Sequence, residues 1–191
     1  MPDNLTIASP LGTPTAQRVE GAGLTLTERR DVGMLLIRGV ATNEEFVTYF
    51  EELLGVKPPE GRSAVAAGAF SIVRMGRTDY LISGDLEAVE ALSRKAEASA
   101  EGVPCIAAEI THGRIIVDME GKGALTVLSK SCGLDTRPAV FPVGLGTRTR
   151  FADGLAYIER LGEDHFRLVT DRSVGQYFWA WLKDAGDEFL T

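Results

Sequence analysis

The stretch GLGTRTR, from Gly144 to Arg150, combines residue types that can hold an anion. Glycine-rich backbone can turn N–H groups toward a phosphate or carboxylate, and Arg148 and Arg150 can donate to it from their guanidinium groups. No helix is expected directly after the stretch, and no Lys-Ser/Thr pair closes it, so neither a phosphate loop nor a dinucleotide fingerprint is predicted. We favour an exposed loop between a helix and a hairpin; the alternative is that both arginines pair with acids of a partner.

The two histidines and two cysteines do not suggest a metal site or a nucleophile by their spacing. His165 alternates with Phe166 in a predicted strand and is expected to face solvent. His112 could line a pocket, but no carboxylate or thiol lies nearby at ligand spacing. Cys132 ends an apolar helical stretch and is expected to be a small buried side chain. No Gly-x-Ser-x-Gly motif is present either. From the spacing of the His and Cys residues we expect no metal ion, and from the missing nucleophile motif we expect no catalysis on this chain.

Composition excludes several classes of partner. The 191 residues carry 20 Lys and Arg against 27 Asp and Glu, whereas a nucleic-acid partner requires a basic excess on one face. No apolar run reaches the roughly 20 residues of a membrane span, and the N-terminal residues lack the basic and apolar regions of a secretory signal. Two cysteines, Cys105 and Cys132, are too few for a disulfide scaffold. We therefore expect a globular protein in the reducing cytoplasm, with no nucleic-acid or membrane partner.

The first half of the chain predicts an extended arm followed by alternating strands and helices. Residues 1–30 are rich in Thr, Pro, Gly and Ala, and we interpret them as an N-terminal arm that lies on a surface. VGMLLIRG predicts a strand, and ATNEEFVTYFEELLG a helix with a capping box from Thr42 to Glu45. A Pro/Gly loop, a hairpin that turns at 76–79 and a helix capped by Asp85 complete this half.

The second half repeats this order of elements. GRIIVDMEG predicts a strand, KGALTVLSKSCG a helix, and LDTRPAVFPVGLGTRTRFADG a Pro/Gly loop. LAYIERLGEDHFRLVT predicts a hairpin that turns at 162–164, and RSVGQYFWAWLKDAG a helix with a capping box from Ser173 to Gln176. The hairpin glycines Gly76 and Gly162 lie 86 positions apart.

The repeated order predicts an α+β protein made of duplicated strand-helix-hairpin-helix units, with antiparallel or mixed sheets packed against helices. Residues 31–191 are expected to form a single compact unit, with pseudo-repeats at about 31–100 and 105–191. One such unit alone leaves one face of its sheet bare, and pairing two copies buries both faces.

The last helix contains both tryptophans of the chain, two positions apart. Helical periodicity places Trp181 on the core stripe and leaves Tyr177 and Trp179 on its flanks. A large aromatic side chain beside a core stripe is typical of a contact with another molecule. We therefore predict a partner interface formed by Trp179, Tyr177, Arg148 and Arg150.

Several short motifs in the second half occur together in one protein family. They are Cys132 with Leu-Asp soon after it, FPVG at 141–144, the hairpin RLGEDHFRLV, Arg172-Ser173 at the start of the last helix, and WLKDAGDEF near the end. In these features the chain resembles the gamma subunit of heterotetrameric sarcosine oxidase. The resemblance is good from about residue 112 onward and, in the first half, extends only to the order of elements.

The resemblance implies a fold and a role. The gamma family looks like a relative of the folate-binding domain of the glycine-cleavage aminomethyltransferases, which is itself a duplication. It implies a small non-catalytic subunit in a complex that oxidatively demethylates sarcosine. The larger alpha, beta and delta-type subunits would hold FAD, FMN, NAD and tetrahydrofolate, and this chain would hold no cofactor.

Other functions stay open at this stage. The aminomethyltransferases carry an acidic residue that contacts the folate amine, near the start of the strand that resembles LAYIERL. That position falls at about Gly154 or Leu155, one or two residues from Asp153. The alternatives are a stand-alone folate-dependent one-carbon protein, the small subunit of a related N-methyl amino acid dehydrogenase, and a free-standing interaction module.

Overall fold

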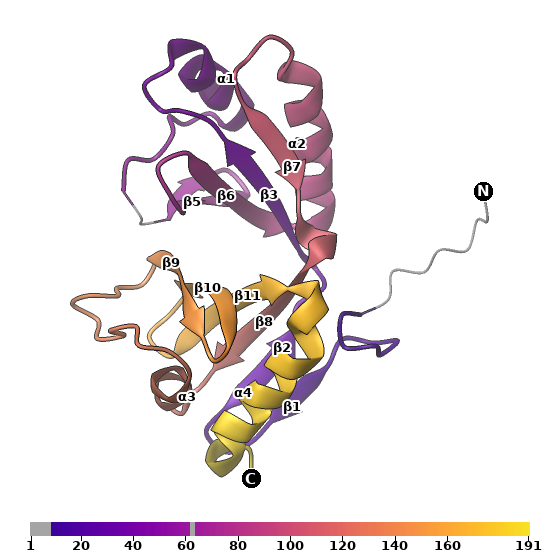
Figure 1. Ribbon diagram of the computed structural model, residues 1–191, viewed down its shortest axis with the longest axis vertical. Helices are drawn as coiled ribbons and strands as arrows, with labels where there is room; N and C mark the ends of the chain where they lie inside the picture. The colour runs from indigo at the N-terminus through magenta and orange to yellow at the C-terminus, as the bar shows by residue number, and fades with distance from the viewer. Residues whose placement is uncertain (1–8, 62–63) are drawn as a thin grey trace.

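The first of two antiparallel sheets lies in the first half of the chain (Figure 1). The computed structural model describes residues 9–61 and 64–191. The elements of the first half are β3 (Val32–Arg38), α1 (Glu44–Leu54), β4 (Val65–Ala67), β5 (Phe70–Arg74), β6 (Asp79–Asp85), α2 (Leu86–Ser99) and β7 (Ile106–Glu109). The strands lie in the order β4-β5-β6-β3-β7, and every neighbouring pair is antiparallel.

The second sheet has six strands and takes two of them from the N-terminal segment. Its elements are β1 (Arg18–Glu20), β2 (Thr25–Glu28), the 3-10 turn η1 (Thr111–Gly113), β8 (Arg114–Glu120), α3 (Ala124–Ser131), β9 (Gly146–Phe151), β10 (Gly154–Arg160), β11 (His165–Asp171), the 3-10 turn η2 (Arg172–Val174) and α4 (Gly175–Leu190). The strand order is β1-β2-β8-β11-β10-β9, again antiparallel throughout.

The two sheets share one arrangement. The first unit places β3, β6, β5 and β4 side by side, and the second places β8, β11, β10 and β9 in the same relation. In each sheet one further strand is added. β7 pairs with the side of β3 that β6 leaves free, and β2 pairs with the side of β8 that β11 leaves free. The predicted α+β fold of duplicated units with antiparallel sheets is therefore confirmed.

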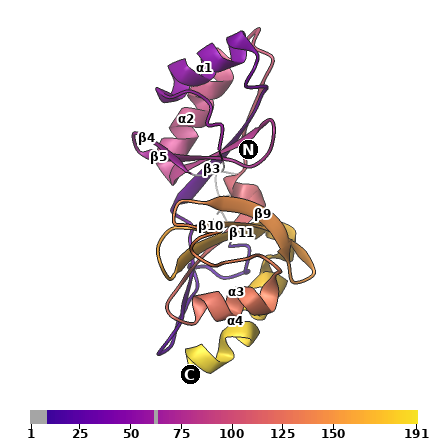
Figure 2. The same cartoon turned by 90° about the vertical axis from the view of Figure 1, so that its left-hand side faces the viewer.

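The molecule has four layers in the order helix, sheet, sheet, helix. Helices α1 and α2 cover the outer face of the first sheet, and α3 and α4 cover the outer face of the second (Figure 2). The two inner faces pack against each other through a separate apolar cluster, which contains Met34, Val73, Leu81, Ile116, Tyr157 and Val169. Each sheet thus buries the face that its own helices leave bare, as two-layer units require. Among the described residues, no helix is long and apolar enough to cross a membrane.

Local signals located the hairpins and one helix start correctly. The predicted turns separate β5 from β6 and β10 from β11, and the Asp85 carboxylate accepts hydrogen bonds from the N–H groups of Glu87 and Ala88 at the start of α2. At α1, however, the cap is Asn43 rather than Thr42. The predicted box at Ser173 is also wrong, because a 3-10 turn over these residues precedes α4, which has no side-chain cap.

The prediction of a surface arm is wrong for residues 18–28, which form β1 and β2. Leu24 and Leu26 alternate with polar residues and are almost fully buried in the core of the second sheet. Two strands of only three and four residues give a weak period-2 pattern, and the Gly/Thr-rich composition hid it. The part of the predicted arm at residues 1–8 lies outside the described residues.

The predicted loop between α3 and the second hairpin contains a further strand, β9, at the edge of the second sheet. Arg148 lies opposite Tyr157 and Arg150 opposite Leu155. Gly146 allows the Tyr157 side chain to approach, because a Cβ there would overlap its hydroxyl. The Gly-Thr-Arg-Thr-Arg alternation belongs to a strand that is paired on one side only, where charged residues are common.

A buried arginine fixes the loop that leads into β9. Arg160 is 2% exposed, and its guanidinium group donates to the carbonyl oxygens of Thr136, Phe141, Gly162 and Glu163. These acceptors belong to the loop before β9 and to the turn between β10 and β11. One side chain therefore holds together two segments that have no regular hydrogen-bond ladder of their own.

The expected placement of the two tryptophans is wrong. Trp179 is 8% exposed and lies in the second core, whereas Trp181 is half-buried and its indole N–H donates to the Ser131 hydroxyl at 3.0 Å. The buried side of α4 includes Gly175 and Gly186, and a Cβ at Gly186 would overlap Leu24. Helical periodicity counted only the large apolar residues of α4 and left out its buried glycines. It therefore placed the core stripe on the side of Phe178 that includes Trp181 instead of the side that includes Trp179.

This placement predicts unequal losses of stability. Trp179→Ala should lower the free energy of unfolding by about 3–5 kcal/mol, because it empties a large volume in the core. Trp181→Phe should cost about 1 kcal/mol, since it removes one hydrogen bond from a half-buried ring. Urea unfolding of both variants measures the difference, and equal losses would contradict the assignment of Trp179 to the core.

Candidate functional site

Asp118 on β8 is the centre of an ionic cluster between the sheets. Its side chain is fully buried, and Arg167 on β11 donates to its two oxygens from Nε and Nη2 at 2.7 and 2.8 Å. Arg29, which precedes β3, donates to Oδ2 at 2.5 Å and also pairs with the exposed Asp31 at 2.7 Å. Both arginines line a hollow with Ser71 and Ser83 of the first sheet. A single carboxylate thus joins β8, β11 and the segment that crosses between the sheets.

His165 lies beside this cluster rather than facing solvent as expected. Its side chain is 32% exposed, and Nε2 lies 3.6 Å from Asp118 and 3.7 Å from Glu120. Nε2 itself is buried, with no hydrogen-bond partner among the described residues. The expectation was wrong because alternation along one strand does not show which side chains of the paired strand lie beside it. His165 lies directly opposite Glu120 in the β8–β11 ladder.

Glu159 and Tyr157 occupy the same inner face on β10. The Tyr157 hydroxyl donates to Oε2 of Glu159 at 3.2 Å, and both side chains are nearly fully buried. Burial raises the pKa of the Glu159 carboxyl, while the positive charge of Arg167 acts in the opposite direction. Burial, together with Glu159, raises the pKa of Tyr157 well above its usual value. The hydroxyl of Tyr157 and the carboxyl of Glu159 are thus each other's hydrogen-bond partners, although Tyr157 also lines a cavity described below.

A cavity of about 280 Å³ opens where the two inner faces diverge. We call it the inter-sheet cavity. Its walls are apolar side chains from both sheets together with four polar residues near the ends of β8, β9 and β11. The lining comprises Met34, Leu36, Met75, Leu81, Ile110, Arg114, Arg148, Leu155, Ala156, Tyr157, Val169, Thr170 and Asp171.

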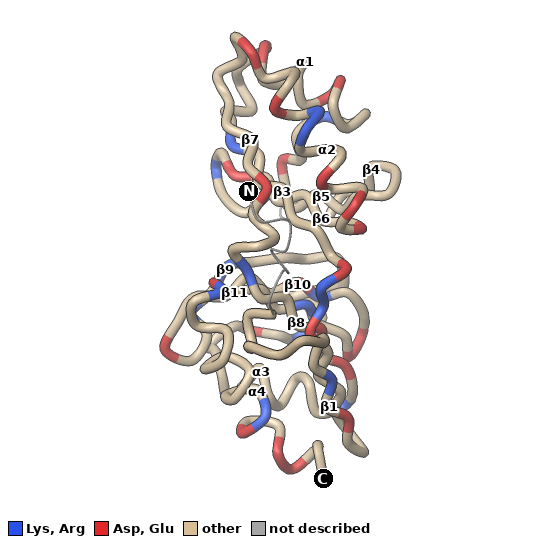
Figure 3. Tube along the Cα trace, turned by 90° about the vertical axis from the view of Figure 1, so that its right-hand side faces the viewer, with Lys and Arg blue, Asp and Glu red and all other residues tan. Residues whose placement is uncertain are grey.

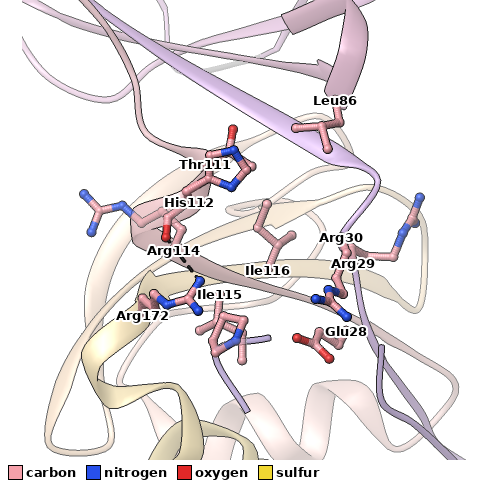
Figure 4. Close-up of a pocket in the computed structure, with 11 residues that line it drawn as sticks. Glu28, Arg29, Arg30, Leu86, Thr111, His112, Arg114, Ile115, Ile116 and Arg172 are labelled. Atoms are coloured by element: carbon pink, nitrogen blue, oxygen red, sulfur yellow. Dashed lines mark hydrogen bonds between the residues drawn. The ribbon is translucent and has the colours of Figure 1, made fainter. Parts of the chain in front are cut away.

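A second, smaller pocket of about 190 Å³ lies on the other side of Arg114. Figure 4 shows that the side chains of Arg29, Arg30 and Arg172 extend in different directions around an apolar floor that includes Ile116. Arg172 donates to the carbonyl oxygen of His112 at 3.4 Å, so this histidine lines a pocket, as the sequence suggested. These guanidinium groups do not converge on one point, and the pocket therefore lacks the geometry of an anion site.

An exposed apolar surface lies at the far end of the inter-sheet cavity. Leu155, Val174 and Tyr177 are 62%, 39% and 44% exposed and line a hollow of about 260 Å³. The Tyr177 hydroxyl is within 3.3 Å of the Asp153 carboxylate and donates to it. We call this patch the Leu155 surface. Asp153 lies in the exposed turn between β9 and β10 and lines this hollow rather than the inter-sheet cavity.

Three of the four residues predicted for a partner interface gather around the Leu155 surface. Tyr177 lines it, Arg150 lies opposite Leu155 in the β9–β10 ladder, and Arg148 lies two residues away on the same strand. Trp179 does not join them, because it is buried in the core. Leu155 was missed, although an apolar residue at the exposed start of a predicted hairpin is a signal that could have revealed it.

Charged residues are distributed unevenly along the chain (Figure 3). Basic positions on β8, β9 and β11 cluster where the two sheets meet, although the protein as a whole carries a net charge of −7. Much of this basic charge is paired with acids: Arg29 and Arg167 with Asp118, and Arg114 with Asp171. The cluster therefore joins structural elements more than it attracts a polyanion.

The described residues contain no group of three His, Cys, Asp or Glu side chains arranged to hold a metal ion. Cys105 and Cys132 are free thiols and half-buried. Burial raises the pKa of both thiols, which keeps them protonated near neutral pH and lowers their reactivity.

Two pseudo-equivalent units with antiparallel sheets, packed face to face between helices, define the class of the protein as a duplicated α+β module. The family is shown by direct comparison. The chain belongs to the sarcosine oxidase, gamma subunit family, whose model matches residues 38–188. The resemblance seen in the second half of the sequence is thereby confirmed.

Individual relatives agree with this assignment. Sarcosine oxidase subunit gamma of Corynebacterium sp. (strain U-96) is 26% identical over 136 residues, which are 71% of this chain and 65% of that protein. The Arthrobacter sp. subunit gamma is 25% identical over 137 residues, 72% of this chain and 66% of that protein. The matched regions thus span slightly less than two thirds of these relatives.

Solved structures agree with the fold. A chain of the heterotetrameric sarcosine oxidase from Corynebacterium sp. U-96, in complex with pyrrole 2-carboxylate, superposes with a TM-score of 0.81 and 25% identity, over 91% of this chain and 89% of that one. The glycine cleavage system aminomethyltransferase T from Bartonella henselae gives 0.66 with 16% identity, over 85% of this chain and 46% of that one. The predicted similarity to the aminomethyltransferase fold is confirmed.

Removal of the Asp118 carboxylate should be strongly destabilising. Asp118→Ala leaves Arg167 without its buried counter-ion, and we expect a loss of about 3–5 kcal/mol in the free energy of unfolding. Asp31→Ala is the matched control, because it removes the exposed partner of Arg29 and should cost less than about 1 kcal/mol. Urea unfolding measures both values. Similar small losses would show that the buried cluster contributes little.

Glu159 should make stability depend on pH. Burial raises its folded-state pKa above the ordinary 4.5, so the stabilising contribution is fully present below 4.5 and is lost as pH rises through the raised pKa. Glu159→Gln is neutral at every pH and retains an acceptor for Tyr157. Its stability relative to the unsubstituted protein should therefore increase as pH rises above 4.5 and through the raised pKa, as followed by urea unfolding. A difference that does not vary with pH would contradict the raised pKa.

Proposed function

We propose that this chain is the small, non-catalytic gamma-type subunit of a heterotetrameric complex that oxidatively demethylates sarcosine. The observation that carries the proposal is the family match over residues 38–188. The similarity to a chain of a solved heterotetrameric sarcosine oxidase supports it. Its partners would be the larger alpha, beta and delta-type subunits, in the cytoplasm. FAD, FMN, NAD and tetrahydrofolate would be held by those subunits and not by this one.

The chemistry of the interior supports a non-catalytic role. The buried acids Asp118 and Glu159 are engaged by Arg167 and Tyr157, and both thiols are held in the protonated form by burial. A general base or nucleophile must instead reach a substrate from a solvent-accessible cleft. Asp118 and Glu159, the buried acids of the inner face of the second sheet, thus bond to neighbouring side chains.

The Leu155 surface, with Tyr177, Arg148 and Arg150, is the interface that we propose for the larger subunits. An exposed Leu, Val and Tyr around one hollow provide the apolar centre that interfaces use, and arginines at the edge can pair with partner acids. Trp179 supports this region from the core and is not proposed to contact the partner itself, which revises the residue set predicted from the sequence.

Assembly should depend on Leu155. We expect Leu155→Asn to weaken association with the co-expressed larger subunits by about 2 kcal/mol, roughly thirtyfold in Kd, while the isolated chain keeps its stability. Ile106→Asn is a matched control, because Ile106 is 61% exposed, close to the 62% of Leu155, but lies on β7 of the other sheet. Co-purification and titration of the subunits measure the effect.

Two outcomes separate the proposals. If the unsubstituted chain fails to co-purify with the larger subunits, the proposed subunit role is wrong. If it assembles, and the Leu155 and Ile106 variants assemble equally well, the subunit role stands and the location of the interface is wrong.

A further inference from the structure

The inter-sheet cavity contains an arginine whose charge is not neutralised by the protein. Arg148 lines the cavity from β9, opposite Tyr157 in the ladder. Among the described residues no carboxylate lies within ion-pair distance of its guanidinium group, although such partners hold Arg29, Arg114 and Arg167. Arg148 is exposed, so water solvates its charge in the free chain, and its guanidinium group is available to donate to an anionic ligand at the edge of the cavity.

A second guanidinium group increases this positive charge. Arg114, at the start of β8, lines the same cavity and pairs with Asp171. Burial lowers the pKa of Arg114, and the nearby charge of Arg148 lowers it further. The two arginines and Asp171 leave one net positive charge at the edge of the cavity. The other polar groups are engaged, since Thr170 donates to the carbonyl oxygen of Leu155 and Tyr157 donates to Glu159.

The rest of the cavity is apolar and comes from both sheets. Met34, Leu36 and Leu81 of the first sheet face Val169 and Tyr157 of the second. Several lining side chains, such as Leu36 and Ile110, are only half-buried, although they lie between two packed layers. The volume of about 280 Å³ is near the lower end of the range of small-molecule sites, roughly 300–1,000 Å³.

We propose that the inter-sheet cavity binds a small carboxylate with an apolar body, with Arg148 as its charged contact. The carboxylate lies at the edge of the cavity against Arg148, and the apolar body lies between the two sheets beside Leu81 and Val169. A guanidinium group can hold a carboxylate with two parallel hydrogen bonds, which favours this anion over a neutral ligand of the same shape. This inference goes beyond the proposed subunit role: Arg148 and Leu155 also belong to the proposed interface, but the site lies within the isolated chain and can be tested there.

The test is calorimetric titration of the full chain with benzoate at low ionic strength, with benzamide as a neutral ligand of nearly the same shape. We expect saturable binding of benzoate and at least about tenfold weaker binding of benzamide. Arg148→Gln should weaken benzoate binding by about tenfold or more. Arg150→Gln is the matched control, because Arg150 lies two residues further along β9 and does not line the cavity. Circular dichroism shows whether each variant is folded.

Three results would overturn the proposal. They are the absence of saturable benzoate heat with the unsubstituted chain, equal binding by the folded Arg148→Gln variant, and equal losses from Arg148→Gln and Arg150→Gln. The last result would mean that general attraction to a basic strand accounts for the binding. Because the measurement uses the isolated chain, it does not depend on assembly with other subunits.

Discussion

The burial of two bare sheet faces against each other is the constraint on which this structure depends. The helices of each unit cover only one face of its sheet, and neither unit can leave the other face in water. The contact between these faces is not uniform along its length. Apolar residues such as Met34 and Ile116 form one cluster in this contact, Asp118 and two arginines form an ionic cluster beside a hollow, and the inter-sheet cavity is left unfilled. The apolar cluster, the Asp118 cluster and the inter-sheet cavity are thus three zones of one contact.

The ionic zone shows how charged groups are accommodated in the interior. Asp118 is bonded by guanidinium groups from β11 and from the segment that leads into β3, so its charge joins both of these elements to β8. Buried ion pairs of this kind add little net stability compared with apolar packing, but the loss of one partner is costly. The contribution of the Asp118 cluster is therefore to tie β8 to β11 and to Arg29 more than to add net stability.

Patterns formed by neighbouring residues predicted the fold well. Features that depend on contacts between distant segments were not predicted. The hairpin turns, the Asp85 cap and the duplicated order depend on local sequence, and the structure has them. The core position of Trp179 depends instead on Leu24, more than a hundred residues earlier, which packs against Gly186 on α4. The surroundings of His165 likewise depend on the pairing of β11 with β8, which brings Asp118 and Glu120 beside it from more than 40 residues earlier. For the candidate site, residue types identified Tyr177 and the two arginines, but only the β9–β10 pairing placed them around Leu155.

The edge position of β9 determines how a partner can bind there. An edge strand offers unpaired backbone groups, and an incoming strand could extend the sheet. Arg148 and Arg150 lie on β9 with exposed side chains, and charged residues on an edge strand disfavour such pairing. A partner at this edge is therefore expected to bind through side chains, with acids for the arginines and an apolar residue for the hollow beside Leu155. The same two arginines, interpreted in the sequence as part of a loop, thus protect the edge of the sheet and leave its side-chain surface available for contact.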